Sequence, residues 1–310
     1  MKAIALPHYG DADTLELTEL PTPAVAPGEF LIRVKAAGVN PADEKIAVGN
    51  LDGIMVTHFP LVPGFEMAGI VEARGFGATE FEIGDEVIGF VLKDWAQNGT
   101  YAELVSAPAR TLARKPESWD WLHSACLPLN GLTAHQAVRR IDIGEGDTVL
   151  IHGAAGGVGT LGVQMVVARG ARVIGTASER NHDYLRELGA TPITYGAGLA
   201  ERVREVAPEG VDAALDFFGG DSVAVSRQVL KDPARVASVA DVTAPEQGGQ
   251  LVWARADADE LTEVAALAGS GQLSVPVNRS FPLEQAADAW RMLHDGSRTR
   301  GRIVLDIDAA

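Results

Sequence analysis

Cysteine, aromatic residues and positive charge are all scarce in this 310-residue sequence. Its single cysteine, Cys126, excludes a disulfide framework and any cysteine-rich zinc lobe. Lys and Arg number 26 against 42 Asp and Glu, which leaves a formal net charge of −16. Because so acidic a surface repels nucleic-acid phosphates and anionic lipids, we expect neither nucleic acid nor a membrane as a partner. One reduced thiol is consistent with the cytoplasm, where we expect the protein to reside.

Charged residues are also missing from one long stretch. Residues 148–168 contain no Asp, Glu, Lys or Arg, and their length alone is enough to cross a bilayer. Glycines cluster in the middle of the stretch, where they would break a membrane helix. We therefore expect a strand, a turn and a helix here rather than a membrane span.

The chain is long enough for two domains, and its predicted secondary-structure pattern changes twice along the sequence. The first hundred or so residues contain short β-rich segments between Pro- and Gly-rich connections, which is typical of a compact barrel or sandwich. Helical spacing begins near Pro116, and Pro128 is expected to divide two helices. Strands and helices then alternate to about Gly248, which predicts βαβ units in a parallel sheet. The residues after Gly248 no longer alternate between strand and helix, so we expect them to belong to the N-terminal domain.

A glycine-rich turn, Gly153–Gly159, follows the apolar segment TVLIH and precedes a helix and a second strand. Glycine at these positions allows a tight turn and lets a pyrophosphate approach the backbone amides, and a helix N-terminus offers free N–H groups. This context is more specific than a glycine motif alone. The turn predicts a dinucleotide site, with a structural turn in another α/β fold as the alternative. The expected contact residues are Ala155, Gly156, Gly157 and Val158.

The end of the second strand bears on the choice of cofactor. An NAD site usually places a carboxylate there, whereas this strand ends in Thr176, Ala177 and Ser178. Arg180 follows, and a guanidinium pairs well with a 2′-phosphate, although Arg180 as a solvated residue is the alternative. Glu179 argues against NADP, because it is a carboxylate one position past the residue that discriminates NAD from NADP. We favour NADP(H), with Ser178 and Arg180 as ligands of the 2′-phosphate.

Several short motifs occur in a characteristic order, namely AAGVNPAD, VPGFEMAGIV, FEIGDEVIGF, LPLNGLTAHQA, the GAAGGVG turn and FPLEQAADAWRML. Through them essentially the whole chain resembles the medium-chain dehydrogenase/reductase superfamily, zinc-independent quinone oxidoreductase branch. The resemblance implies an α/β fold in which a Rossmann doubly wound parallel sheet (118–248) is inserted into a GroES-like β-rich catalytic domain (1–117 and 249–310). It also implies NADPH as cofactor and a homodimer that pairs through the edge of the Rossmann sheet, near residues 235–240 and the residues after them.

The zinc-dependent branch of that superfamily carries a Cys in the segment that here reads GVNPAD, and a His where this chain has Phe65. A lone Glu66 cannot hold a tetrahedral zinc ion, so we expect no metal. Without a Lewis acid, the favoured substrates are quinones or α,β-unsaturated carbonyls, whose developing negative charge is delocalised. An enone or enoyl-thioester reductase of a biosynthetic pathway and a non-catalytic NADPH-binding sensor or structural protein are the alternatives.

The resemblance implies further site residues. Asn40 matches an Asn beside the nicotinamide and is a candidate catalytic and cofactor-binding residue, whose amide would hydrogen-bond the substrate or the cofactor, with an Asn-Pro turn residue as the alternative. Asp43 is a candidate general acid/base or, alternatively, a helix cap. Tyr195 matches a Tyr near the adenosine phosphate, and His152 is expected to be a satisfied buried residue. The other matched cofactor-binding positions are Thr133, Val239, Ala240, Val252 and Trp253.

Overall fold

The computed structural model describes residues 1–294 and 300–308, and the chain divides into two compact units. The first unit comprises Met1–Leu129, Ala256–Gly269 and Val275–Ala310, so it draws on both ends of the chain. The second unit comprises Asn130–Arg255 and Ser270–Ser274. The expected boundaries were 117/118 and 248/249, and the structure places the changes of unit somewhat later along the chain.

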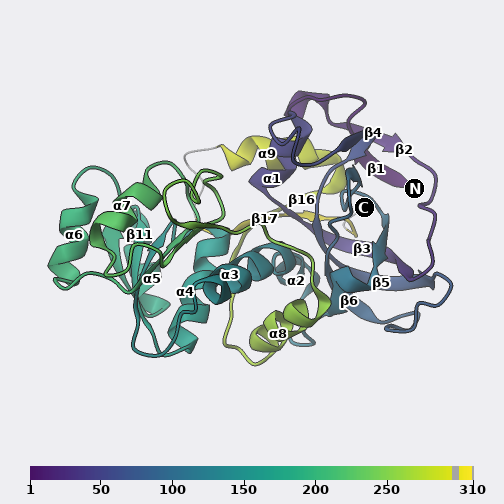
Figure 1. Ribbon diagram of the computed structural model, residues 1–310. Helices are drawn as coiled ribbons and strands as arrows, with labels where there is room; N and C mark the ends of the chain where they lie inside the picture. Colours follow the sequence, from purple (N-terminus) through teal and green to yellow (C-terminus); the bar gives the residue numbers. More distant parts are fainter. Residues whose placement is uncertain (295–299, 309–310) are drawn as a thin grey trace. The chain divides into compact units, whose positions relative to one another are not determined.

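A seven-stranded sheet is the framework of the first unit. Its strands, in spatial order, are β16 (Val277–Pro282), β17 (Arg302–Asp306), β3 (Glu29–Val39), β5 (Glu66–Arg74), β6 (Glu86–Phe90) and β9 (Leu112–Arg114), with β8 (Leu104–Pro108) also paired to β3. The C-terminal strand β17 runs antiparallel to β3, with Ile303 opposite Val39. Figure 1 shows these two strands, drawn in yellow and blue-purple, side by side from opposite ends of the sequence. The tail therefore completes the N-terminal sheet.

Smaller elements of the first unit surround this sheet. Its short strands are β1 (Lys2–Ala5), β2 (Glu16–Glu19), β4 (Thr57–Val62) and β7 (Ala96–Asn98). Its helices are α1 (Pro41–Ala47), α2 (Trp121–Ala125), α8 (Ala258–Gly269) and α9 (Ala286–Leu293). The prediction that Pro128 divides two helices is confirmed, because α2 ends at Ala125 and α3 (Pro128–Arg140) begins at the proline.

The second unit contains a six-stranded parallel sheet. The spatial order is β12 (Ala190–Thr194), β11 (Arg172–Ala177), β10 (Thr148–His152), β13 (Ala213–Asp216), β14 (Val236–Ser238) and β15 (Gln250–Leu251). The accompanying helices are α4 (Gly157–Ala168), α5 (His182–Glu187), α6 (Leu199–Val206) and α7 (Ser222–Val229). The chain winds outward from β10 in both directions, which makes the carboxyl end of β10 a topological switch point, where open α/β sheets bind ligands.

Apolar side chains pack on both faces of this parallel sheet, as such sheets require. Val149 and Ile151 of β10 belong to one apolar cluster, and Leu150 between them belongs to a second. The prediction of strand, turn and helix over 148–168 is confirmed by β10 and α4. In the two described ranges, no helix has the length and apolar character that spanning a bilayer demands.

Candidate functional site

The glycine turn between β10 and α4 is held by a threonine of the neighbouring strand. Gly153 begins the turn with φ at +67°, in the left-handed region that favours glycine. Thr176 Oγ1 accepts a hydrogen bond from the Gly153 N–H at 3.1 Å, and the Thr176 carbonyl accepts one from Ala154 at 3.1 Å. A Cβ on Gly159 would lie 2.1 Å from the Gly153 carbonyl oxygen, so α4 begins directly against the turn.

The outer side of this turn suits an anion. Gly156 is exposed, and Ala155, Gly157 and Val158 are half-buried. Gly156 is the N-cap of α4 and has no side chain to cap the helix, whose first N–H groups lack intrahelical partners. Free amides at the positive end of a helix bind phosphate, so the turn fits a pyrophosphate.

The residues that follow β11 present a hydroxyl and a guanidinium. Ser178 is half-buried and caps a short 3-10 turn, Glu179–Asn181. The side chain of Asn181 donates to Ser178 Oγ at 3.3 Å. Glu179 and Arg180 are both exposed. The strand thus ends on Ala177 and Ser178 rather than on a carboxylate.

Most of the other predicted cofactor-binding residues also follow carboxyl ends of strands in the parallel sheet. Tyr195 follows β12, and Val239 and Ala240 follow β14. Val252 is buried in the large apolar cluster against which Ala155 and Val239 also pack. The remaining three predicted residues are Thr133, buried on α3, Trp253, exposed beyond β15, and Asn40, buried at the start of α1 in the first unit.

His152 and Gly162 support the turn from within the second unit. His152 is buried, its Nε2 lies 2.8 Å from Ser226 Oγ, and burial lowers its pKa to about 4. The prediction of a satisfied buried histidine is therefore confirmed. A Cβ on Gly162 would lie 2.7 Å from the Phe217 ring, so this glycine allows that ring to pack against α4.

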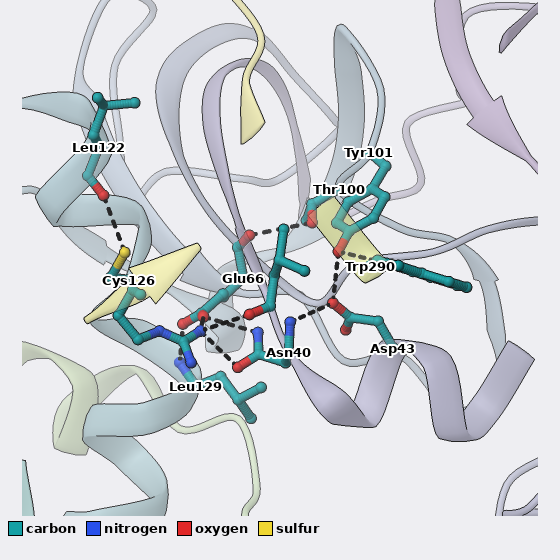
Figure 2. Close-up of polar contacts among 11 residues, drawn as sticks. Asn40, Asp43, Glu66, Thr100, Tyr101, Leu122, Cys126, Leu129 and Trp290 are labelled. Atoms are coloured by element: carbon teal, nitrogen blue, oxygen red, sulfur yellow. Dashed lines mark hydrogen bonds and ion pairs between the residues drawn. The ribbon is translucent and has the colours of Figure 1, made fainter. Parts of the chain in front are cut away.

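The first unit contains a buried polar cluster around Glu66 (Figure 2). Arg302 donates to Glu66 Oε1 at 2.6 Å and to Asn40 Oδ1 at 2.7 Å. The Asn40 side chain donates to the same Glu66 oxygen at 2.9 Å, and the Leu129 N–H donates to the other at 2.9 Å. Both carboxylate oxygens are therefore engaged, and the guanidinium neutralises their charge.

Asp43 lies on α1 beside this cluster and is fully buried. Its Oδ2 accepts hydrogen bonds from the Asn40 N–H at 2.9 Å and from the Tyr101 hydroxyl at 2.8 Å. Trp290 Nε1 donates to the same hydroxyl at 3.2 Å, as Figure 2 shows. Burial raises the pKa of Asp43 to about 7. Asp43 was expected as the cap of the following helix, but Asn40 is the N-cap of α1 and Asp43 is its third residue, whose carboxylate accepts from the Asn40 N–H as one half of a capping box. An acid–base role for Asp43 stays a prediction.

The donor set around Glu66 does not fit a zinc ion. The Glu66 carboxylate is already paired with Arg302, and burial raises the pKa of the Cys126 thiol to about 12, far from the thiolate that zinc requires. The thiol donates to the Leu122 carbonyl at 3.2 Å. Over residues 1–294 and 300–308, no group of three or more His, Cys, Asp or Glu side chains is arranged to hold a metal ion.

Two residues of these sites were not predicted from the sequence: Thr176 as a support of the turn, and Arg302 as the partner of Glu66. Glu66 carried a usable signal, because it is a lone charge between apolar residues and a buried carboxylate needs a partner. Arg302 follows other arginines, and a polar Thr near the end of a strand is common, so neither gave a comparable signal.

Comparison with known proteins identifies the family. Residues 26–117 match the family model described as an alcohol dehydrogenase GroES-like domain, and residues 188–305 match the one described as a zinc-binding dehydrogenase. The quinone oxidoreductase of Coxiella burnetii superposes with a TM-score of 0.87 and 33% identity, covering 99% of each chain. The chain belongs to the medium-chain dehydrogenase/reductase superfamily. Within it, the chain belongs to the quinone oxidoreductase branch, and the predicted combination of a GroES-like domain with a Rossmann sheet is confirmed.

Two curated relatives are similar over most of the chain. The NADPH-dependent alkenal/one oxidoreductase of Arabidopsis thaliana is 30% identical over 315 residues, which are 98% of this chain and 79% of that protein. The synaptic vesicle membrane protein VAT-1 homolog-like of Mus musculus is 35% identical over 233 residues, or 74% of this chain. That match spans 54% of the mouse protein, about half of its length.

Proposed function

We propose that the chain is an NADPH-dependent, zinc-independent oxidoreductase that reduces quinones or other conjugated carbonyls. The observation that carries the proposal is the glycine turn at the switch point of a parallel sheet, followed by a helix whose N-cap has no side chain to occupy its first amides. The names of the Coxiella and Arabidopsis relatives support both the acceptor class and the cofactor.

The residues of the second unit are assigned to the parts of the dinucleotide. The amides of the turn bind the pyrophosphate, and Ser178 and Arg180 bind the 2′-phosphate. NADPH, when bound, supplies a hydride to the acceptor. The residues assigned to the nicotinamide end are Thr133, Val239, Ala240, Val252 and Trp253.

The polar cluster of the first unit limits the acceptors that can react. Reduction of a plain ketone places a localised alkoxide charge in the transition state, which calls for a Lewis acid or a strong proton donor. Glu66 is held by Arg302, and Asp43 is fully buried under Tyr101. A quinone or an enone delocalises the negative charge, so its transition state needs less electrostatic stabilisation from the protein. We assign Asn40 and Asp43 to positioning: Asn40 holds Glu66, and Asp43 fixes the backbone of Asn40.

A parallel screen of acceptors tests the reaction. NADPH oxidation would be followed with a quinone, an alkenone, an enoyl thioester, a simple ketone and, in reverse, a secondary alcohol with NADP+. We expect turnover of the quinone or the alkenone. Turnover of the enoyl thioester alone would favour the biosynthetic alternative, and turnover of the alcohol alone would refute the proposal. NADPH binding without any oxidation would favour the non-catalytic alternative.

The choice of NADPH has its own test. R180A removes the guanidinium assigned to the 2′-phosphate, so we expect KM for NADPH to rise about tenfold, since a charge-assisted hydrogen bond contributes roughly 1.5–3 kcal/mol. The KM for NADH, which lacks that phosphate, should stay within twofold. R186A is the matched control, because Arg186 is an exposed arginine of the next helix, paired with Asp183. Equal effects of R180A on both nucleotides would refute the assignment.

A further inference from the structure

The net charge of the chain is divided unevenly between the two units. The first unit contains 14 Lys and Arg against 27 Asp and Glu, whereas the second unit contains 12 against 15. The formal charge is therefore −13 on the first unit and −3 on the second. The acidic excess belongs to the unit whose polar cluster is proposed to limit the acceptors.

Most basic side chains of the first unit already have a carboxylate partner. Arg302 is buried against Glu66, and Arg74 is paired with Glu82 at 2.8 Å. The other Lys and Arg of this unit that form ion pairs are Arg33, Lys35, Lys93, Arg110, Arg114, Lys115 and Arg291. A cation whose charge is balanced by a carboxylate attracts a phosphate only weakly.

The chain beyond α1 adds almost no positive charge. Between Lys45 on α1 and Lys93 beyond β6 the sequence contains one basic residue, the paired Arg74, against seven acidic residues. Lys45 is exposed, but it directly follows Glu44 and supplies a single charge. This part of the first unit therefore has little with which to hold an anion.

The exposed side chains of the same segment are apolar. Ile54 and Val56 are 59% and 62% exposed. The Ala96 N–H donates to the Val56 carbonyl at 2.9 Å, so the exposed Trp95 lies alongside this segment. Asp94, next to Trp95, is an acidic residue with its side chain 86% exposed. An uncharged apolar molecule suits such a surface, whereas a phosphate would lose water without gaining a cation.

We propose that the first unit selects uncharged acceptors and discriminates against acceptors that carry phosphate groups, such as thioesters of coenzyme A. The inference rests on the proposed function, because the acceptor is the one of that reaction. An acidic surface lowers the local concentration of an anion, which slows its association about tenfold or more at low ionic strength. NADPH is an anion as well, but its phosphates are assigned to the second unit, which has little net charge and the free amides of the glycine turn.

A matched pair of thioesters tests the discrimination. An enoyl thioester of coenzyme A and the same enoyl group on N-acetylcysteamine share the reacting atoms, and only the first carries phosphates. With NADPH saturating, we expect kcat/KM for the coenzyme A thioester to be at least tenfold lower at about 10 mM salt. The gap should shrink at least threefold at about 150 mM salt, because the Debye length falls from roughly 30 Å to roughly 8 Å. A gap that does not change with salt would mean that size and not charge excludes the larger thioester, which would overturn the proposal.

Two variants locate the effect in the first unit. D94K reverses the exposed charge beside Trp95, and E209K makes the same change of net charge at an exposed residue between α6 and β13 of the second unit. At low salt we expect D94K to raise kcat/KM for the coenzyme A thioester about threefold and to leave the N-acetylcysteamine thioester unchanged. E209K should leave both thioesters within about 1.5-fold of the wild type, since the added charge lies in the other unit. Equal effects of the two variants would contradict the role of the first unit.

The remaining outcomes separate this proposal from the proposed function. If the acceptor screen identifies quinones and no thioester, a naphthoquinone and its sulfonate replace the pair, and the ratio of their kcat/KM values should show the same dependence on salt. A protein that reduces the charged and the uncharged member equally well at low salt refutes the discrimination and leaves the proposed reaction intact. A protein that reduces no acceptor refutes both.

Discussion

At the scale of single residues, Asp43 makes stability depend on pH. Burial raises the pKa of Asp43 from 3.8 to about 7, so between these values the folded protein binds more protons than the unfolded chain. The stability that this group contributes is complete below pH 3.8 and is lost as the pH rises through about 7. A shift of this size corresponds to at most about 4 kcal/mol.

The variant D43N tests this linkage. An asparagine side chain does not ionise, but its oxygen still accepts the hydrogen bonds from the Asn40 N–H and the Tyr101 hydroxyl. The decrease in unfolding free energy between pH 4 and 8 should therefore be smaller in D43N than in the wild type. Urea unfolding at several pH values measures it, with D288N, a change at an exposed aspartate, as the control. A wild-type pH slope in D43N would show that Asp43 is not the group responsible.

The buried ion pair of Glu66 and Arg302 gives a second prediction at this scale. R302A leaves the Glu66 carboxylate fully buried and without its cation, so we expect a loss of about 3–5 kcal/mol in unfolding free energy. R33A removes one partner of the more exposed Arg33–Glu72 pair and should cost less than about 1 kcal/mol. Denaturant titration compares the two variants, and similar losses would contradict the assigned role of the buried pair.

Candidate residues held by consecutive segments could be predicted from the sequence, whereas contacts between distant segments could not. The glycine turn and Ser178 were predictable, because the strand, turn and helix that position them are consecutive in the chain. The pairing of Arg302 with Glu66 was not, because the two residues are 236 positions apart and come together only when β17 and β5 both pair with β3.

At the scale of elements, strong local patterns predicted segments well. Short β-rich segments were expected in the first hundred or so residues, and Glu29–Val39 forms one of them, β3. Several strands with weak patterns were missed, among them β15, which has only two residues, and β16, which has the partly polar sequence VNRSFP. Neither has an apolar pattern of its own, and each is a strand because a distant partner, β14 or β17, supplies its hydrogen bonds.

The first turn of α4 gives a prediction at this scale. In G159A the new methyl group would lie 2.1 Å from the Gly153 carbonyl oxygen, so the turn and the helix start must move apart. We expect the affinity for NADPH to fall at least tenfold, because the amides lose their convergence on the phosphates. G144A is the control, since a Cβ there meets nothing within 4 Å. Fluorescence titration with NADPH measures both, and wild-type affinity in G159A would contradict the role of the turn.

At the scale of the whole molecule, we propose that the chain forms a homodimer through the edge of the parallel sheet at β15. Light scattering after size-exclusion chromatography should give about twice 32.6 kDa. Each copy carries a formal charge of −16, so association should weaken at low ionic strength, where the repulsion is less screened. Dilution series at about 10 mM and 150 mM salt test this, and a monomer under both conditions would exclude the dimer.

The pairing of β17 with β3 also has a consequence for synthesis on the ribosome. The second unit is complete once residue 274 has emerged from the exit tunnel, whereas β3 still lacks β17 and Glu66 still lacks Arg302. In a nascent chain the first 129 residues therefore cannot complete the sheet of the first unit until β17 has been synthesised. Premature termination before Arg302 would leave Glu66 without its cation and one edge of β3 unpaired. We expect quality-control proteases to remove such a truncated chain.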